Sequence, residues 1–285
     1  SGTDIYVAGY TRNSSGYYVP CYWLNGIRTD LSVLYNTGWG FADSIFVSGT
    51  DIYVAGYTRN SSGYYVPCYW LNGIRTDLSV LYNTGWGFAD SIFVSGTDIY
   101  VAGYTENSSY TPVPCYWLNG TRTDLSVLDS AENGYTRSIF ISGTDIYVAG
   151  YTANSSGDYV PCYWLNGTRT DLSVLDSAEN GYTRSIFISG TNIYVSGNTY
   201  NSSNVSVPCY WLNGTRMNLS VLDNTKYGTA ISIYVSGTDI HIAGYTYNSS
   251  DIRVPCYWLN GTRTDLSVLD SNSQGRAYSI FVNEE

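Results

Sequence analysis

Aromatic residues stand beside carboxylate, amide or guanidinium side chains at equivalent places of a repeated sequence. Aromatic faces stack on sugar rings and polar neighbours hydrogen-bond hydroxyl groups, so this mixture predicts a surface for a glycan or a peptide. The same residues could instead pack on a neighbouring strand, and the sequence leaves both interpretations open. The predicted site comprises Trp39, Phe41, Asp43, Trp86, Phe88, Asp90, Tyr135, Arg137, Tyr182, Arg184, Tyr227, Arg276 and Tyr278.

Residues that could carry catalysis are few. His241 is the single histidine, and it replaces a strand tyrosine of the other copies. The carboxylate pairs Asp129 with Glu132 and Asp176 with Glu179 could do acid–base work, but solvated loop carboxylates also explain them. No Ser-His-Asp set, HExxH sequence or clustered metal ligands occur. We therefore expect a non-catalytic protein with no cofactor and no metal, although calcium at loop carboxylates stays open.

The elements that position these residues belong to one unit that occurs six times. The sequence VPCYWLNG recurs at intervals of 47 residues, which defines repeats 1–47, 48–94, 95–141, 142–188, 189–235 and 236–282. A fixed period of this length indicates a repeat architecture. We interpret residues 1–285 as a single domain built from these repeats.

Each repeat contains four short segments typical of β-strands. In the blade that starts at the end of the first copy and continues into the second, these are residues 44–47, 51–58, 66–71 and 74–78, and the last two are joined by Asn-Gly, a strong hairpin signal. The 31 tyrosines and 29 glycines also favour an all-β fold without helices. Four antiparallel strands per 47 residues predict the blade of a six-bladed β-propeller, with a β-solenoid as the alternative.

The first blade, built from the N-terminal strands, lacks its own innermost strand. We expect residues 279–282 to supply it by joining the N-terminal strands within residues 4–34, which would close the ring and cover an open sheet edge.

Comparison of the copies separates a constant framework from two variable places. Cys21, Trp23 and their equivalents recur in all six copies, which favours a role in packing. Arg28 and Asp30, with Asp4 one strand away in sequence order, predict a polar network that fixes blade geometry. Copy five replaces both acids, by Asn192 and Asn218. The variable places are the turn after the second strand, where Arg12, Arg59, Glu106, Ala153, Tyr200 and Tyr247 are equivalent, and the long connection at 35–43. Both connections should emerge on one face, which is therefore the predicted binding face.

The six cysteines occupy one equivalent position per repeat. In a ring of six blades these positions would lie roughly 15 Å apart, while a disulfide needs Cα atoms within about 7 Å. We therefore expect buried free thiols and no disulfide at Cys21, Cys68, Cys115, Cys162, Cys209 and Cys256.

Charge and hydropathy exclude other partners. The net charge of −10 leaves no basic stripe for nucleic acid. No apolar run approaches the about 20 residues that span a bilayer. A glycan, peptide or protein partner stays open, and a monomer is the simple expectation.

The pattern SIFVSGTDIYVAGYT…VPCYWLNGTRTDL resembles the YVTN-type blades of bacterial secreted and lipoprotein β-propellers. The resemblance covers the whole chain and implies a propeller fold and an extracellular or cell-surface location, although this chain carries no signal sequence. It implies nothing definite about activity, because propellers host enzymes, lectins and scaffolds. The interpretation is a non-catalytic scaffold or binding module of unknown ligand. The alternatives are lectin-like binding on the variable face, an engineered or recently amplified repeat protein with no ligand, and, least favoured, a hydrolase.

Overall fold

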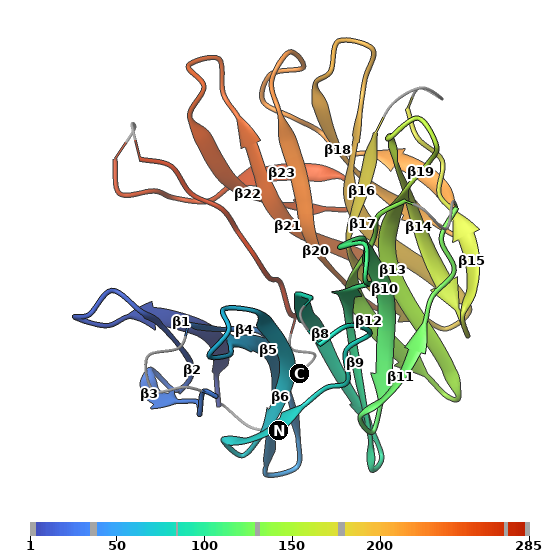
Figure 1. Cartoon of the computed structure of the whole chain (residues 1–285). Coiled ribbons are helices and arrows are strands. Elements are labelled where there is room, and N and C mark those ends of the chain that lie inside the picture. Colours follow the sequence, from blue (N-terminus) through green and yellow to red (C-terminus); the bar gives the residue numbers. More distant parts are fainter. Residues whose placement is uncertain are drawn as a thin grey trace. The chain divides into compact units, whose positions relative to one another are not determined.

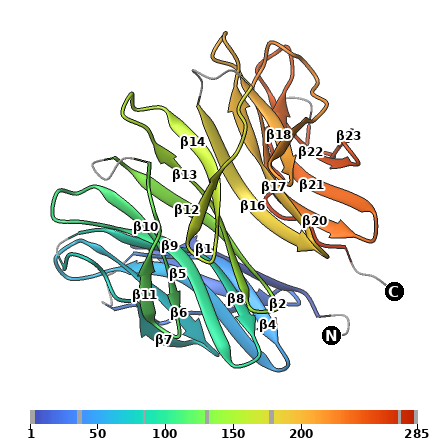
Figure 2. The same cartoon turned by 90° about the vertical axis from the view of Figure 1, so that its right-hand side faces the viewer.

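The computed structural model describes residues 4–34, 39–83, 85–128, 132–175, 180–270 and 273–282. All described secondary structure is β, and the chain forms six antiparallel sheets (Figures 1 and 2). The predicted all-β propeller class is confirmed. None of the described residues belongs to a helix with the length and hydropathy that a membrane span requires.

Contacts divide the chain into two compact units, residues 1–144 and 145–285. The strands of unit 1 are β1 (Tyr6–Arg12), β2 (Tyr18–Leu24), β3 (Ile27–Asp30), β4 (Gly40–Ser48), β5 (Asp51–Arg59), β6 (Tyr65–Leu71), β7 (Ile74–Asp77), β8 (Gly87–Ser95), β9 (Asp98–Glu106), β10 (Pro112–Leu118), β11 (Thr121–Asp124) and β12 (Gly134–Ser142). Those of unit 2 are β13 (Asp145–Ala153), β14 (Tyr159–Leu165), β15 (Thr168–Asp171), β16 (Gly181–Ser189), β17 (Asn192–Tyr200), β18 (Ser206–Leu212), β19 (Thr215–Asn218), β20 (Gly228–Ser236), β21 (Asp239–Tyr247), β22 (Arg253–Leu259) and β23 (Thr262–Asp265).

Each blade is a meander in which neighbours in sequence are neighbours in the sheet, as in β4-β5-β6-β7 and β20-β21-β22-β23. The hairpin between the last two strands turns at Asn-Gly, where Asn72 and Gly73 have φ values of 49° and 82°. Both residues lie in the left-handed region, which is the geometry of the two-residue turn that the sequence predicts.

The first strand of a blade is longer than the sequence predicts. We expected a connection up to residue 43 and a strand over 44–47, whereas β4 begins at Gly40. The reason is a β-bulge between Ala42 and Ser44, opposite Gly56 of β5. A side chain on Gly56 would place its Cβ 2.0 Å from the Phe41 carbonyl oxygen, so only glycine fits there. The bulge interrupts the alternation of strand residues, which made this half of the strand resemble a loop.

The C-terminal segment that we expected to close the ring has no strand assignment. The first sheet has three strands, β1-β2-β3, and residues 279–282 are described without strand structure. Within unit 2 the Ile280 N–H donates to Ser232 Oγ at 3.2 Å, and Phe281 packs on Tyr234 at 4.9 Å. This segment therefore lies along β20 with no ladder partner in its own unit, and a strand needs such a partner.

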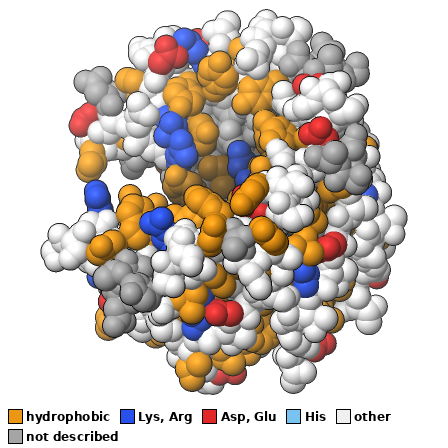
Figure 3. All heavy atoms as spheres, viewed as in Figure 1, with side chains coloured by type: hydrophobic (Ala, Val, Ile, Leu, Met, Phe, Trp, Pro, Cys, Tyr) orange, Lys and Arg blue, Asp and Glu red, His pale blue; other side chains and the backbone are white. Residues whose placement is uncertain are grey.

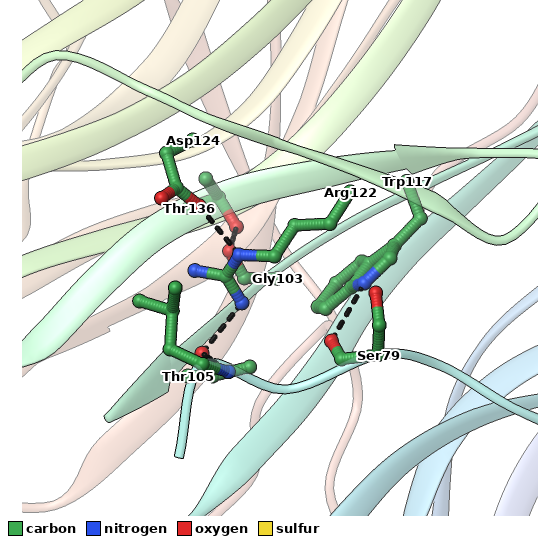
Figure 4. Close-up of polar contacts among 8 residues, drawn as sticks. Ser79, Gly103, Thr105, Trp117, Arg122, Asp124 and Thr136 are labelled. Carbon is green, nitrogen blue, oxygen red and sulfur yellow. Dashed lines mark hydrogen bonds and ion pairs between the residues drawn. The ribbon is translucent and has the colours of Figure 1, made fainter. Parts of the chain in front are cut away.

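Tryptophans link neighbouring blades, as their constancy predicts. Trp117 is fully buried, and its Nε1–H donates to the Ser79 carbonyl of the preceding blade at 2.9 Å (Figure 4). Trp70, Trp211 and Trp258 make the same bond to Ser32, Ser173 and Ser220. The six cysteines are free and buried, so the predicted burial is confirmed.

The constant arginine and acid form an ion pair, as predicted. Arg122 donates to Asp124 and to Thr105, each at 2.5 Å (Figure 4). The equivalent of Asp4 is not part of this pair, because Asp98 accepts from Asn119 of the hairpin turn at 2.8 Å.

In copy five both acids are replaced by amides that keep the same partners. Asn213 donates to Asn192, and Arg216 donates to Asn218. An amide oxygen accepts these bonds as a carboxylate does, so the negative charge is dispensable at these two places.

Candidate ligand-binding pocket

A continuous row of aromatic rings crosses the blades of unit 1 near the start of their first strands. Rings from the first and second strands alternate: Tyr10, Phe41, Tyr57, Phe88, Tyr104 and Tyr135, with centroid distances of 4.7, 5.1, 4.7, 4.8 and 4.8 Å. We call this set the aromatic row. Spacings of 4.5–7 Å are those of favourable edge-to-face and offset pairs, so these rings stabilise one another, at about 0.5–1.5 kcal/mol per pair.

The predicted site residues of unit 1 lie in or beside the aromatic row. Phe41, Phe88 and Tyr135 belong to it. Trp39 and Trp86 stand edge-on to Tyr18 and Tyr65 at 4.7 and 4.8 Å. Their contacts in this unit are with other aromatic side chains of the protein, and a ligand-binding role for them stays a prediction.

The predicted acids of unit 1 sit at the bulge positions of β4 and β8. Asp90 accepts from Arg137 at 3.4 Å. Burial raises the pKa of Asp43 to about 7, and the nearby charge of Asp90 adds to this shift. Burial also raises the pKa of Asp90 to about 6, against the opposing effect of Arg137. Asp129, Asp176 and Glu179 lie outside the described residues.

In unit 2 the row is interrupted, and a pocket occupies the gap. Tyr151 and Tyr182 still pair at 4.9 Å. The next two positions of the row, which are aromatic in most copies, are held by Asn198 and Thr229. A third side chain is also smaller in this copy, because Ser206 occupies the position of Tyr18, Tyr65 and Tyr159 in other copies. Three small side chains in one copy therefore leave the space that rings fill in others.

The resulting pocket has a volume of about 280 Å³ and lies between the sheets β16–β19 and β20–β23. These sheets are next to each other in both ribbon views (Figures 1 and 2). We call it the copy-five pocket. It is lined by Tyr182, Arg184, Asn198, Tyr200, Ser206, Tyr227, Thr229, Tyr245 and Tyr247.

All five lining tyrosines make edge contacts with one another around the pocket. Tyr227 and Tyr247 are 6.3 Å apart, Tyr247 and Tyr245 are 6.0 Å apart, and Tyr182 lies 6.1 Å from Tyr200. Burial raises the pKa of Tyr182 to about 12, with smaller contributions from neighbouring tyrosines. The hydroxyl of Tyr182 is therefore protonated at neutral pH and can both donate and accept a hydrogen bond.

The floor of the pocket holds an unused acceptor. Asn198 is 3% exposed, and its Oδ1 accepts no hydrogen bond from any described residue. Buried polar atoms in native proteins nearly always have a partner, so each exception needs an explanation. In the wall of a pocket, such an oxygen can accept a hydrogen bond from a water molecule or from a ligand.

Positively charged side chains gather at the β21 side of the pocket. The Arg253 and Arg276 guanidinium groups each lie 5.1 Å from the centre of the Tyr245 ring, and Arg253 also donates to the Tyr247 hydroxyl at 2.7 Å. In the space-filling view, blue side chains adjoin orange ones, the colour that includes tyrosine, over β21 and β22 (Figure 3).

Sequence reasoning found part of this pocket. Tyr182, Arg184 and Tyr227 were predicted and do line it, while Arg276 lies beside it. Tyr278 is 66% exposed and lies outside the lining. The missed lining residues are Asn198, Tyr200, Ser206, Thr229, Tyr245 and Tyr247. Comparison of the repeats could have found three of them. Tyr200 and Tyr247 are at the variable turn, and Asn198 occupies a position that is tyrosine in the other five copies.

Comparison with known proteins supports the fold and goes no further. No protein-family model matches the chain, and no curated protein matches its sequence. A triple arginine-to-alanine mutant of AofleA from Arthrobotrys oligospora is similar in structure, with a TM-score of 0.51 and 11% identity over 92% of this chain and 83% of that chain.

Two further solved structures have lower scores. The SapL1 lectin in complex with alpha methyl fucoside has a TM-score of 0.47, with 12% identity over 93% of this chain and 95% of that one. A GH43_1 enzyme from Xanthomonas citri complexed with xylose has a TM-score of 0.40, with 10% identity over 82% and 92%. The six antiparallel sheets and the similarity to AofleA identify the fold as a β-propeller, and the YVTN-type resemblance stays a prediction.

Proposed function

We propose that this protein is a non-catalytic, lectin-like β-propeller that binds a carbohydrate in the copy-five pocket. The observation that carries the proposal is the buried, unbonded Asn198 Oδ1 in a pocket walled by tyrosines. A sugar hydroxyl donates to such an oxygen, and a sugar ring offers C–H faces to the aromatic rings.

Size supports a small occupant. Pockets for drug-sized ligands measure about 300–1,000 Å³. At about 280 Å³ the copy-five pocket suits a single sugar residue, either free or at the end of a longer glycan. Binding from the end of a glycan would also fit the extracellular or cell-surface location that we propose.

The test is a glycan array followed by calorimetric titration of the best ligand, with Tyr200→Ala as the variant. Copy four carries Ala153 at this position, so the fold tolerates alanine there. We expect Tyr200→Ala to weaken binding about tenfold or more, because truncating a tyrosine that carries binding energy costs on the order of 2 kcal/mol. Arg59→Ala is the matched control, since it changes the equivalent position of unit 1 and should leave binding unchanged. A blank array, or equal losses in both variants, would refute the proposal.

A ligand-free scaffold is the second candidate function. It is favoured by the identity of copies one and two, which indicates recent amplification or construction. A scaffold has no saturable ligand, whereas a bound glycan raises the melting temperature as its concentration increases. Thermal unfolding across a ligand titration therefore separates the two functions.

A further inference from the structure

The net charge of the pocket lining is positive, whereas that of the whole chain is negative. The nine lining residues include Arg184 but neither Asp nor Glu, although the chain carries a net charge of −10. Arg253 and Arg276 lie against Tyr245 from outside the lining. Arg184 is therefore the one charged side chain among the nine lining residues, and its guanidinium group stays charged at every physiological pH.

The position of Arg184 is fixed by the backbone. It is the extra residue of the bulge between Thr183 and Ser185 in β16, and bulges redirect a side chain next to functional sites. Its charge reaches the lining: burial raises the pKa of Tyr200, and the Arg184 guanidinium opposes that shift. The equivalent residues Asp43 and Asp90 are acids, so the sign of the charge at this bulge differs between copies.

Two requirements thus meet in one pocket. Asn198 Oδ1 needs a hydrogen-bond donor such as a hydroxyl, and the arginines favour a negative group. A neutral sugar satisfies only the first requirement, and a simple anion such as phosphate satisfies mainly the second. A sugar that carries a carboxylate or a sulfate ester satisfies both.

We propose that the copy-five pocket selects negatively charged sugars, such as uronic acids or sulfated sugars, over their neutral counterparts. This inference rests on the proposed carbohydrate function and names its ligand class. Tyrosine faces and Asn198 hold the ring, while Arg184, the charged residue of the lining, binds the anionic group.

The experiment uses matched sugars that differ in one group. Calorimetric titration compares the methyl glycosides of glucose, galactose and mannose with those of the corresponding uronic acids, and with their 6-sulfates. We expect at least one charged member to bind about tenfold or more tighter than its neutral parent, because charge-assisted hydrogen bonds are about twice as strong as neutral ones. The carboxylate and sulfate arms identify which anion is preferred. Methyl fucoside is included as a neutral competitor.

Salt and mutation test the electrostatic cause. Affinity for the charged sugar should fall between 50 and 500 mM NaCl, while affinity for a neutral sugar should change little. Arg184→Gln should fold normally, because the equivalent position is Ile231 and Tyr278 in other copies. It should reduce the ratio of charged-sugar to neutral-sugar affinity toward one. Arg12→Gln, in unit 1, is the control that should preserve the preference.

The outcomes separate the two proposals. If a neutral sugar binds as tightly as its charged partner in every pair, the charge inference is refuted and carbohydrate binding stands. If no sugar of either kind binds, the proposed function and this inference both fail.

Discussion

Replacing Asn198 by tyrosine should raise the free energy of unfolding and weaken ligand binding. Five copies carry tyrosine at this position, so the substitution restores the residue that the blade otherwise uses. The new ring would stack on Tyr182, as Tyr104 stacks on Phe88 at 4.8 Å with an interplanar angle of 24°. It would also occupy the copy-five pocket.

The expected gain in stability follows from two contributions. Removing a buried acceptor without a partner relieves about 1–3 kcal/mol. An added aromatic pair contributes about 0.5–1.5 kcal/mol. We expect the free energy of unfolding to rise by about 2–3 kcal/mol, which corresponds to about 4–10 °C in melting temperature for a chain of this size. The pocket closes, so affinity for its sugar should fall at least about 100-fold.

Differential scanning calorimetry and ligand titration measure the two effects in the same samples. Asn192→Asp is the matched control, because it also restores the residue of the other copies but lies at the opposite end of β17. It should leave both quantities close to those of the unmodified protein. Undiminished sugar binding by Asn198→Tyr would show that the pocket is not the site. A lower melting temperature would show that Asn198 is well accommodated and that the packing argument is wrong.

Three further predictions concern the framework of unit 1. Because the pKa of Asp90 is raised to about 6, the folded protein keeps this carboxyl protonated at pH values at which the unfolded chain has lost the proton. The free energy of unfolding should therefore increase as pH falls from 8 toward 4, by up to about 3 kcal/mol for this group. Denaturant midpoints across this range should show the trend, and Asp90→Asn should reduce it; stability that rises with pH would contradict it. Gly103→Ala should destabilise the protein by about 3 kcal/mol or more, because its Cβ would lie 2.0 Å from the Phe88 carbonyl oxygen. An unchanged midpoint of urea unfolding would contradict this prediction. Burial raises the pKa of Cys68 to about 12, so Ellman's reagent should label thiols slowly in the native protein and rapidly in denaturant, whereas fast native labelling would disprove thiol burial.

Much of the fold could be predicted because the sequence pattern of each strand occurs in six copies. The Asn-Gly turn, the buried cysteine and the buried tryptophan each depend on local chemistry that a single copy displays. The bulge could not be predicted in the same way, because it depends on Gly56 of the neighbouring strand and breaks the alternation by which strands are recognised. Asp43 was therefore placed in a loop although it lies within β4.

The binding pocket was predicted only in part, for a different physical reason. Sequence reasoning looked for side chains that are present, such as Tyr182 and Arg184. The pocket instead results from volume that is absent at Asn198, Ser206 and Thr229, and a missing ring matters only where its neighbours in space are known. The C-terminal segment is a similar case, since strand sequence alone cannot show which edge is within reach.

The equivalence of positions along the aromatic row has a consequence for valency. The copy-five pocket exists because small side chains replace large ones, so a few substitutions of this kind would create a second pocket between another pair of blades. Tyr57→Asn with Tyr65→Ser and Phe88→Thr would reproduce the three truncations of copy five in unit 1. Two weak sites on one chain bind a multivalent glycan surface up to about 10²–10⁴-fold more tightly than one, provided that both can be engaged at once. A duplicated array of this kind can thus change its avidity by losing side chains, without building a new loop.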